Sequence, residues 1–367
     1  MALTNFAALN SQQKIVWSRE LWAEARDMAF TFKFMSTSPN SCFQRVTELT
    51  RTEKGEVVLF QLLADLVNDG VIGDNEREGF EEEMKNYEET VTIDQISHGV
   101  RQKGKLADQK TVIRFRENAR DRLAYWMANR IDQLTFLTLS GVAYSYTNNG
   151  GTRTDSAFAN LAFASDVSAP TTNRHRRWDA TSGLVAGDTT AVAADDTPTY
   201  ETILEAVNYA KIHYVKPLMA GGKEYYVAFV RPETLMHLKK DPDYQRAITS
   251  AGPRSLDNPW FTGATVTIDG LVFHEHRLVF NTTAATSGAA KWGASSNIDG
   301  SRTLICGSQA LVFADLNSPE WSEKWFQYDS SPGINVDKMF GMVKPKFHSI
   351  YDGSTEDFGV IALDHAI

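Results

Sequence analysis

The amino-acid sequence predicts an α+β fold, and three observations carry that prediction. Residues 111–139 place their apolar side chains at steps of three or four, which is the period of one helix face. Residues 56–63 and 88–100 favour strands, and within the second range apolar and polar side chains alternate. Asp269 and Gly270 separate two apolar alternations, and this dipeptide is a strong signal for a β-hairpin.

Composition excludes several classes of protein. The chain has 367 residues, which is enough for two subdomains, and its net charge of −9 excludes a protein that coats nucleic acid over its whole surface. No segment has the apolar run of a membrane-spanning helix or the order of a secretory signal, so we expect a soluble protein with no membrane partner. Cys42 and Cys306 stand in no metal spacing, and we expect both to be reduced and buried.

The first elements are a helix and an aromatic segment. Residues 11–28 have helical periodicity. Phe30, Phe32 and Phe34 then alternate with Thr31 and Lys33, which predicts a strand with one apolar face. We expect this face to pack on a neighbouring subunit.

Residues 51–105 predict a long hairpin whose tip is acidic. Two extended arms flank a segment punctuated by Gly70, Gly73 and Gly79. The tip imitates the start of a calcium loop, but Lys85 stands where a bidentate glutamate is required, so no metal site is predicted. A hairpin of this length with little core of its own needs a partner surface. The acidic residues of the tip are Asp74, Glu76, Glu78, Glu81, Glu82 and Glu83.

The segment 111–139 is the longest predicted element. Asp108 precedes it, Gly141 closes it, and no proline interrupts it. At 1.5 Å per residue such a helix is roughly 40 Å long, so it is expected to span subdomains. The mixed charges on its polar side are typical of a solvated face.

The residues after the long helix predict an irregular connection and then a series of short elements. Residues 141–196 are polar and contain a basic group, Arg174, His175, Arg176 and Arg177, which is more typical of a solvated or intersubunit patch than of a nucleic-acid contact. We then expect a helix from Thr197, a strand at 225–230, a helix from Pro232, a hairpin at 266–273, a strand at 303–306, a helix at 308–314 and strands at 325–347 around a turn at 331–333.

Motifs for catalysis or cofactor binding are missing. His274 and His276 would share one face of a strand with Glu275 opposite, but no third ligand has a recognisable spacing, so a structural pair is the better interpretation. Gly221 and Gly222 precede Lys223 without the upstream glycine of a phosphate-binding loop. We therefore predict no catalytic, cofactor or metal residues, and no enzyme.

Taken in order, the motifs of the chain resemble the N4-type family of tailed-phage major capsid proteins. The resemblance covers roughly residues 55–347. It rests on the acidic hairpin with segment 91–96, His98 and Arg101, the long helix with segment 130–133 and Gly141, segments 226–227 and 231–232, segment 257–263, segment 274–276, and Gly307 with segment 309–310.

This resemblance implies the capsid fold named after phage Hong Kong ninety-seven. The expected organisation is an N-terminal arm and first helix at 1–50, an extended hairpin loop at 51–105, and a peripheral domain with a spine helix and polar connection at 106–196. An axial domain would follow at 197–320, and strands at 321–367 would return to the peripheral domain. The sequence begins near the arm without a long coiled-coil leader, so we expect a fused scaffolding segment to be absent or already removed.

The implied function is self-assembly as the major capsid protein of a tailed bacteriophage. Hexamers and pentamers of the chain would form an icosahedral shell around double-stranded DNA, with a portal at one vertex, after synthesis in the host bacterial cytoplasm. Scaffolding and decoration proteins are left open as partners. From the residues alone we hypothesise that the acidic tip docks on Arg174, Arg176 or Arg177 of a neighbour. Two alternatives remain: an encapsulin-like compartment, and a metal-dependent enzyme centred on His274, Glu275 and His276.

Overall fold

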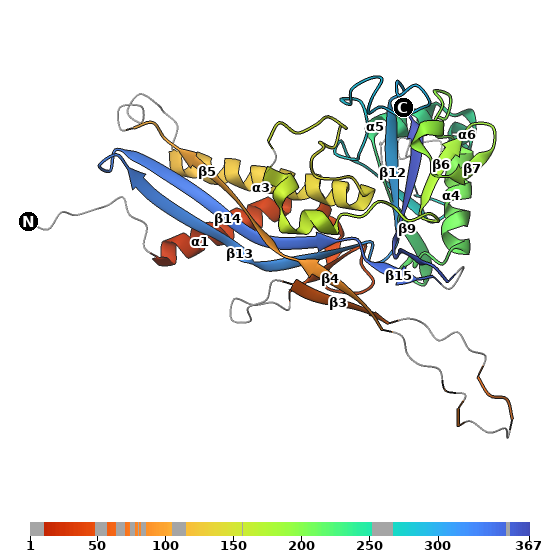
Figure 1. Ribbon diagram of the computed structural model, residues 1–367, viewed down its shortest axis with the longest axis horizontal. Helices are drawn as coiled ribbons and strands as arrows, with labels where there is room; N and C mark the ends of the chain where they lie inside the picture. Colours follow the sequence, from red (N-terminus) through yellow and green to blue (C-terminus); the bar gives the residue numbers. More distant parts are fainter. Residues whose placement is uncertain are drawn as a thin grey trace, which may run out of the picture.

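The computed structural model describes residues 11–47, 57–63, 70–73, 78–79, 81, 86–104, 115–155, 157–251, 267–349 and 353–367. Figure 1 shows an elongated body attached to a head, with a hairpin below them. The body consists of two long helices on a five-stranded sheet, and the head consists of an eight-stranded sheet with three helices. Segment 257–263 and the residues around Asp108, which the sequence analysis used, lie outside the described residues.

The body sheet has the strand order β1-β2-β13-β14-β5, and helices α1 and α3 lie along it. Strands β13 and β14 form a long antiparallel pair, and β5 adds to the outer edge of β14. A turn at residues 327–330 joins the pair, so the predicted turn at 331–333 is wrong by a few residues and those residues begin β14. The elements of the body are α1 (Ser11–Met28), η1 (Thr31–Phe34), β1 (Met35–Ser36), β2 (Phe43–Val46), β5 (Asp94–Arg101), α3 (Phe115–Ser140), β13 (Leu311–Phe326) and β14 (Ser331–Val343).

Helix α3 confirms the predicted long element, and Gly141 ends it as expected. The Gly141 amide donates to the Thr138 carbonyl at 3.1 Å, and the Val142 amide donates to the Leu137 carbonyl at 3.0 Å. These two bonds form a Schellman motif, which requires a left-handed residue at its centre, and Gly141 has φ 65°. The helix therefore stops where the chain must turn toward the head.

The head sheet has the order β10-β11-β9-β12-β17-β6-β7, and β8 pairs with β9 outside this path. Its central strands are buried on both faces. In β9, Val227 and Phe229 pack in the core shared with the body, whereas Tyr226 and Ala228 pack under α4 to α6. The elements of the head are β6 (His175–Asp179), β7 (Gly183–Ala186), η4 (Thr189–Ala191), α4 (Tyr200–Ile212), β8 (Leu218–Ala220), β9 (Lys223–Val230), α5 (Pro232–Lys240), α6 (Pro242–Ala251), β10 (Thr267–Ile268), β11 (Leu271–Glu275), β12 (Gly300–Cys306) and β17 (Val360–Ala366).

Several predictions for single elements hold in the head. Asp269 and Gly270, with φ 48° and 82°, form the predicted tight turn between β10 and β11. Helix α5 begins at Pro232 as expected, whereas α4 begins two to three residues later than predicted, behind a capping box at Thr199. Cys42 and Cys306 are both buried and unbridged.

The remaining elements connect or project from the body. Strands β3 (Val57–Leu63) and β4 (Asn86–Thr92) form the hairpin, and β15 (Lys346–His348) pairs with β16 (Thr355–Asp357) between body and head. Two 3-10 helices, η2 (Ala157–Asn160) and η3 (Ala162–Asp166), follow α3.

The aromatic segment at 30–34 corrects one prediction. It is a 3-10 helix rather than a strand, and its partly buried rings pack against the main core of this chain. Phe30 stacks on His276 at 4.5 Å between ring centroids. Buried Asp132 of α3 fixes the segment, because its carboxylate accepts bonds from the Phe30 and Thr31 amides, both at 3.0 Å.

One further prediction is wrong, and another is incomplete. Residues 308–314 are a turn and the start of β13 rather than a helix. Leu311 and Phe313 face the main core while Val312 and Ala314 face a second core, and a run buried on both sides has no periodicity that separates strand from helix. Residues 141–196 are irregular over most of their length as expected, but the prediction misses β6 and β7, which lie within them.

Strand placement also differs from the expected boundaries at residues 196 and 320. Strand β6 precedes the first boundary and lies in the head sheet, while β13 begins before the second boundary and lies in the body sheet. Strand β17 lies in the middle of the head sheet rather than in the body. The chain therefore crosses between body and head more often than the sequence predicts.

Candidate intersubunit surfaces

The hairpin has a core only at its base. Val58, Phe60 and Val91 are buried against Val312 and Val343 of the body sheet. The opposite face of β3 lacks this cover, since Leu59 is 57% exposed, and Ile72 beyond the strand is 82% exposed. Figure 1 shows β3 and β4 crossing the edge of the body toward the lower right of the view. The predicted hairpin is confirmed, and its outer described residues leave an apolar side chain in solvent.

Two of the six acidic tip residues lie within the described part of the chain. Glu78 and Glu81 are exposed, and the Glu81 carboxylate accepts a 2.7 Å bond from the Gly79 amide. Gly79 has φ 92°, a conformation that favours glycine. Both carboxylates are therefore available to a partner. Asp74, Glu76, Glu82 and Glu83 lie outside the described residues.

The predicted basic group is not a solvated loop, which corrects the sequence interpretation. Arg174 is fully buried beside β6, where its Nε donates to the Asp357 carbonyl at 3.0 Å and its Nη2 to the His213 carbonyl at 2.9 Å. Arg177 is also buried and pairs with Asp179 and Asp196, each at 3.0 Å. These two cations are used inside the subunit.

Arg176 is the most accessible of the three arginines, and it too has an internal partner. Its guanidinium lies 4.1 Å from the centre of the Tyr209 ring and donates to the Tyr209 hydroxyl. Since β6 pairs with β17 and β7, the residues of the basic group alternate between the two faces of the head sheet. Among the described residues, no ion pair joins the acidic tip to the basic group within one subunit.

Sequence reasoning missed a set of buried ion pairs at the junction of body and head. Arg302 of β12 contacts both oxygens of Asp364 in β17, at 2.6 and 2.8 Å, and donates to the Ser140 carbonyl at the end of α3 at 2.7 Å. Burial alone would raise the pKa of Asp364, but the Arg302 guanidinium holds it at about 2. Lys344 pairs with Asp357 at 2.7 Å. Charged residues inside otherwise apolar strands were the available signal.

The histidine pair is structural in this geometry. His274 and His276 pack among Phe30, Phe34 and Phe136, and burial lowers the pKa of both histidines, which favours their neutral forms. Over the described ranges, no group of three or more His, Cys, Asp or Glu residues is placed to hold a metal ion. Nor does any helix of the described chain combine the length and apolar character needed to cross a membrane.

An elongated body, a separate head and a hairpin with an uncovered end define a subunit built to pack against other chains. A family model described as phage capsid protein matches residues 5–367, and the chain belongs to this family. It is 48% identical over 362 residues to the major capsid protein of Pseudomonas phage KPP25, across 98% of this chain and 96% of that relative. The protein is thus the major capsid protein of a bacteriophage and a structural component of the virion capsid, not an enzyme.

Solved capsid structures agree with this assignment. The capsid of Ralstonia phage GP4 matches with a TM-score of 0.75 and 27% identity, over 100% of this chain and 98% of that one. The capsid of cyanophage Pam1 shares the fold, with a TM-score of 0.71 and 19% identity over 100% and 96% of the two chains. The expected α+β capsid fold is confirmed, and assembly of many copies into a shell follows from these structures.

Proposed function

We propose that this chain forms the icosahedral shell of a tailed phage of the N4 type, with the Hong-Kong-ninety-seven-type subunit organisation. The body would be the peripheral domain with α3 as its spine, and the head would be the axial domain. Hexamers and pentamers of the chain would enclose double-stranded DNA, with a portal at one vertex. Assembly would take place in the host cytoplasm.

The observation that carries this proposal is the hairpin. Its base is packed on the body, but Leu59 on the opposite face of β3 and Ile72 beyond the strand are more than half exposed. A two-stranded hairpin with so little core of its own is marginal in water and gains stability when another surface covers it. A neighbouring copy supplies that surface in a closed shell, where each weak contact is repeated many times.

Expression of the full chain alone tests the proposal. We expect sedimentation to show large assemblies and negative-stain microscopy to show closed shells or ring-shaped capsomers. A chain that stays monomeric at all concentrations, and also when mixed with lysate of phage-infected cells, would contradict self-assembly.

A further inference from the structure

The side of α3 near its C-terminal end carries a feature that the packing of the subunit does not use: two arginines beside one aromatic ring. Arg130 of α3 and Arg153 of the following loop lie 5.8 and 5.1 Å from the centre of the Phe158 ring. Arg130 donates to Gln133 Oε1 at 2.7 Å, and Arg153 donates to the same oxygen at 3.5 Å. All four side chains are half-buried, so the two charges converge on one amide oxygen at the surface.

No carboxylate balances this arginine pair within the described residues. Neither guanidinium has a carboxylate oxygen from that part of the chain within 4.0 Å. Asp155 lies in the same loop, but its carboxylate accepts a bond from the Ala157 amide. Burial and the neighbouring Arg130 charge lower the pKa of Arg153, which shows that the pair is electrostatically unfavourable as it stands. An anion placed between the two guanidiniums would relieve this repulsion.

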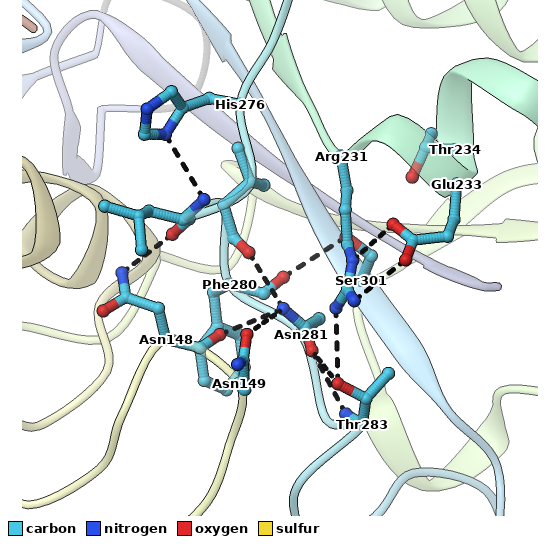
Figure 2. A network of polar contacts seen from close by, with 12 residues as sticks. Asn148, Asn149, Arg231, Glu233, Thr234, His276, Phe280, Asn281, Thr283 and Ser301 are labelled. Atoms are coloured by element: carbon cyan, nitrogen blue, oxygen red, sulfur yellow. Dashed lines mark hydrogen bonds and ion pairs between the residues drawn. The ribbon is translucent and has the colours of Figure 1, made fainter. Parts of the chain in front are cut away.

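The loop that carries Arg153 is held in place before any ligand arrives. Figure 2 shows Asn281 donating to the Asn148 carbonyl at 3.2 Å and to Asn149 Oδ1 at 3.1 Å. Asn148 in turn donates to the Gln133 and Leu278 carbonyls, at 3.2 and 2.8 Å. Arg153 itself is oriented by a 3.0 Å bond from its Nε to the Tyr146 carbonyl. Little conformational entropy is therefore lost when an anion binds.

The surroundings extend the positive charge along the helix. Between Asp121 and Asp132 the sequence of α3 contains no acidic residue, and Asp132 is buried. Exposed Arg122 lies eight residues before Arg130, about 12 Å along the helix axis. Trp126 lies between them and stacks on His98 at 4.5 Å. The surface thus combines separated cations with aromatic rings.

We propose that Arg130 and Arg153 bind a phosphate of the DNA backbone and that this side of α3 is a DNA-contacting surface of the shell. Guanidinium forks match the geometry of phosphate oxygens, and a row of cations with aromatic rings is typical of nucleic-acid binding. The net charge of −9 keeps the contact local and weak, which suits a genome that must leave the shell. The inference rests on the proposed enclosure of double-stranded DNA.

The test measures binding of a fluorescent 30-base-pair duplex to the unassembled full chain at several salt concentrations. One phosphate held between the two guanidiniums contributes about 0.9 to the slope of log Kd against log salt, so R130Q/R153Q should lower the slope by about that amount. R130K/R153K keeps both charges and should keep the slope. Arg246→Gln removes an exposed arginine of the head that already pairs with Asp243 at 2.9 Å, and should change nothing.

Two outcomes would overturn the site. An unchanged slope in R130Q/R153Q would exclude a phosphate contact at these arginines. An equal decrease of the slope in the Arg246→Gln control would show that binding does not depend on this site. Thermal unfolding checks that each variant folds. Shell formation is followed on the same variants, and we expect R130Q/R153Q to assemble normally. Normal shells with an unchanged slope would refute this inference alone, whereas absence of shells from the unmodified chain would count against the proposed function.

Discussion

At the scale of single residues, the head contains polar side chains that are buried and hydrogen-bonded, and His365 is one of them. His365 has no solvent exposure, and its Nδ1 lies 2.9 Å from the Ala366 carbonyl while its Nε2 lies 2.9 Å from the Thr303 hydroxyl. A neutral ring satisfies both contacts, with Nδ1–H donating and Nε2 accepting. Burial lowers the pKa of His365 to about 4.

This burial predicts loss of stability in mild acid. An unfolded histidine has a pKa of about 6.5, so the unfolded chain binds a proton more readily, and stability falls as the pH drops from about 6.5 toward 4. The shift corresponds to about 3 kcal/mol in total. We expect urea unfolding between pH 7 and 4 to show this loss in the native chain and a smaller one in His365→Gln. A flat native profile would contradict the argument.

The residues that sequence could not place are those whose role depends on distant partners. The exposure of acidic tip residues such as Glu78 can be predicted from the local composition alone. Arg174 looks equally polar in sequence, yet it is buried because the carbonyls of Asp357 and His213 satisfy its guanidinium. Those partners lie far along the chain, and no local pattern encodes them. The arginine pair at Arg130 and Arg153 is likewise visible only once the loop folds back on α3.

At the scale of elements, those with a strong local signal were predicted correctly from sequence. A strand buried on both faces has no such signal and was not. The period of α1 and α3 and the Asp-Gly turn predicted their elements because one face or one dipeptide decided the structure. The prediction for the start of β13 was wrong because both faces of this strand are covered. The prediction of a strand for the aromatic segment 30–34 was wrong because Asp132, a residue of another helix, fixes the backbone of that segment.

The C-terminal end of α3 gives a prediction at this scale. In Gly141→Ala the new Cβ would lie 2.5 Å from the Ser168 carbonyl oxygen, in a residue with φ 65°. We expect a loss of about 2–4 kcal/mol in unfolding free energy, from the left-handed backbone and the contact together. Gly221→Ala is the matched control, because it has φ 58° and nothing within 4 Å, so it should cost about 1 kcal/mol. Equal losses in chemical denaturation would show that packing against residue 168 is unimportant.

At the scale of the whole molecule, the interior of the subunit has buried ion pairs, whereas its hairpin leaves charged and apolar side chains exposed. Two buried ion pairs, Arg302 with Asp364 and Lys344 with Asp357, lie at the junction of body and head, so they hold the two parts together rather than meeting other chains. The hairpin is the reverse case. Its acidic end has exposed carboxylates and an exposed Ile72, and we retain the proposal that it contacts a basic surface of a neighbour.

Charge reversal of the hairpin separates folding from assembly. Replacing Glu81, Glu82 and Glu83 by lysine should block shell formation while the melting temperature of the subunit stays unchanged, because exposed Glu81 has no bonding role in the body or head. Sedimentation of the variant measures assembly. A variant with lysine at exposed Asp195, Glu201 and Glu224 of the head carries the same number of charge reversals and controls for total charge. Normal shells from the hairpin variant would refute the proposal.

The position of β17 has a consequence for the order of events in the infected cell. This strand lies between β12 and β6 in the head sheet, yet it follows β6 in sequence by about half the chain. On a translating ribosome β6 therefore has no partner on that side until residues 360–366 have emerged. A nascent chain that lacks β17 therefore has an incomplete head sheet. We therefore expect the shell to grow from subunits whose residues 360–366 have already joined the head sheet.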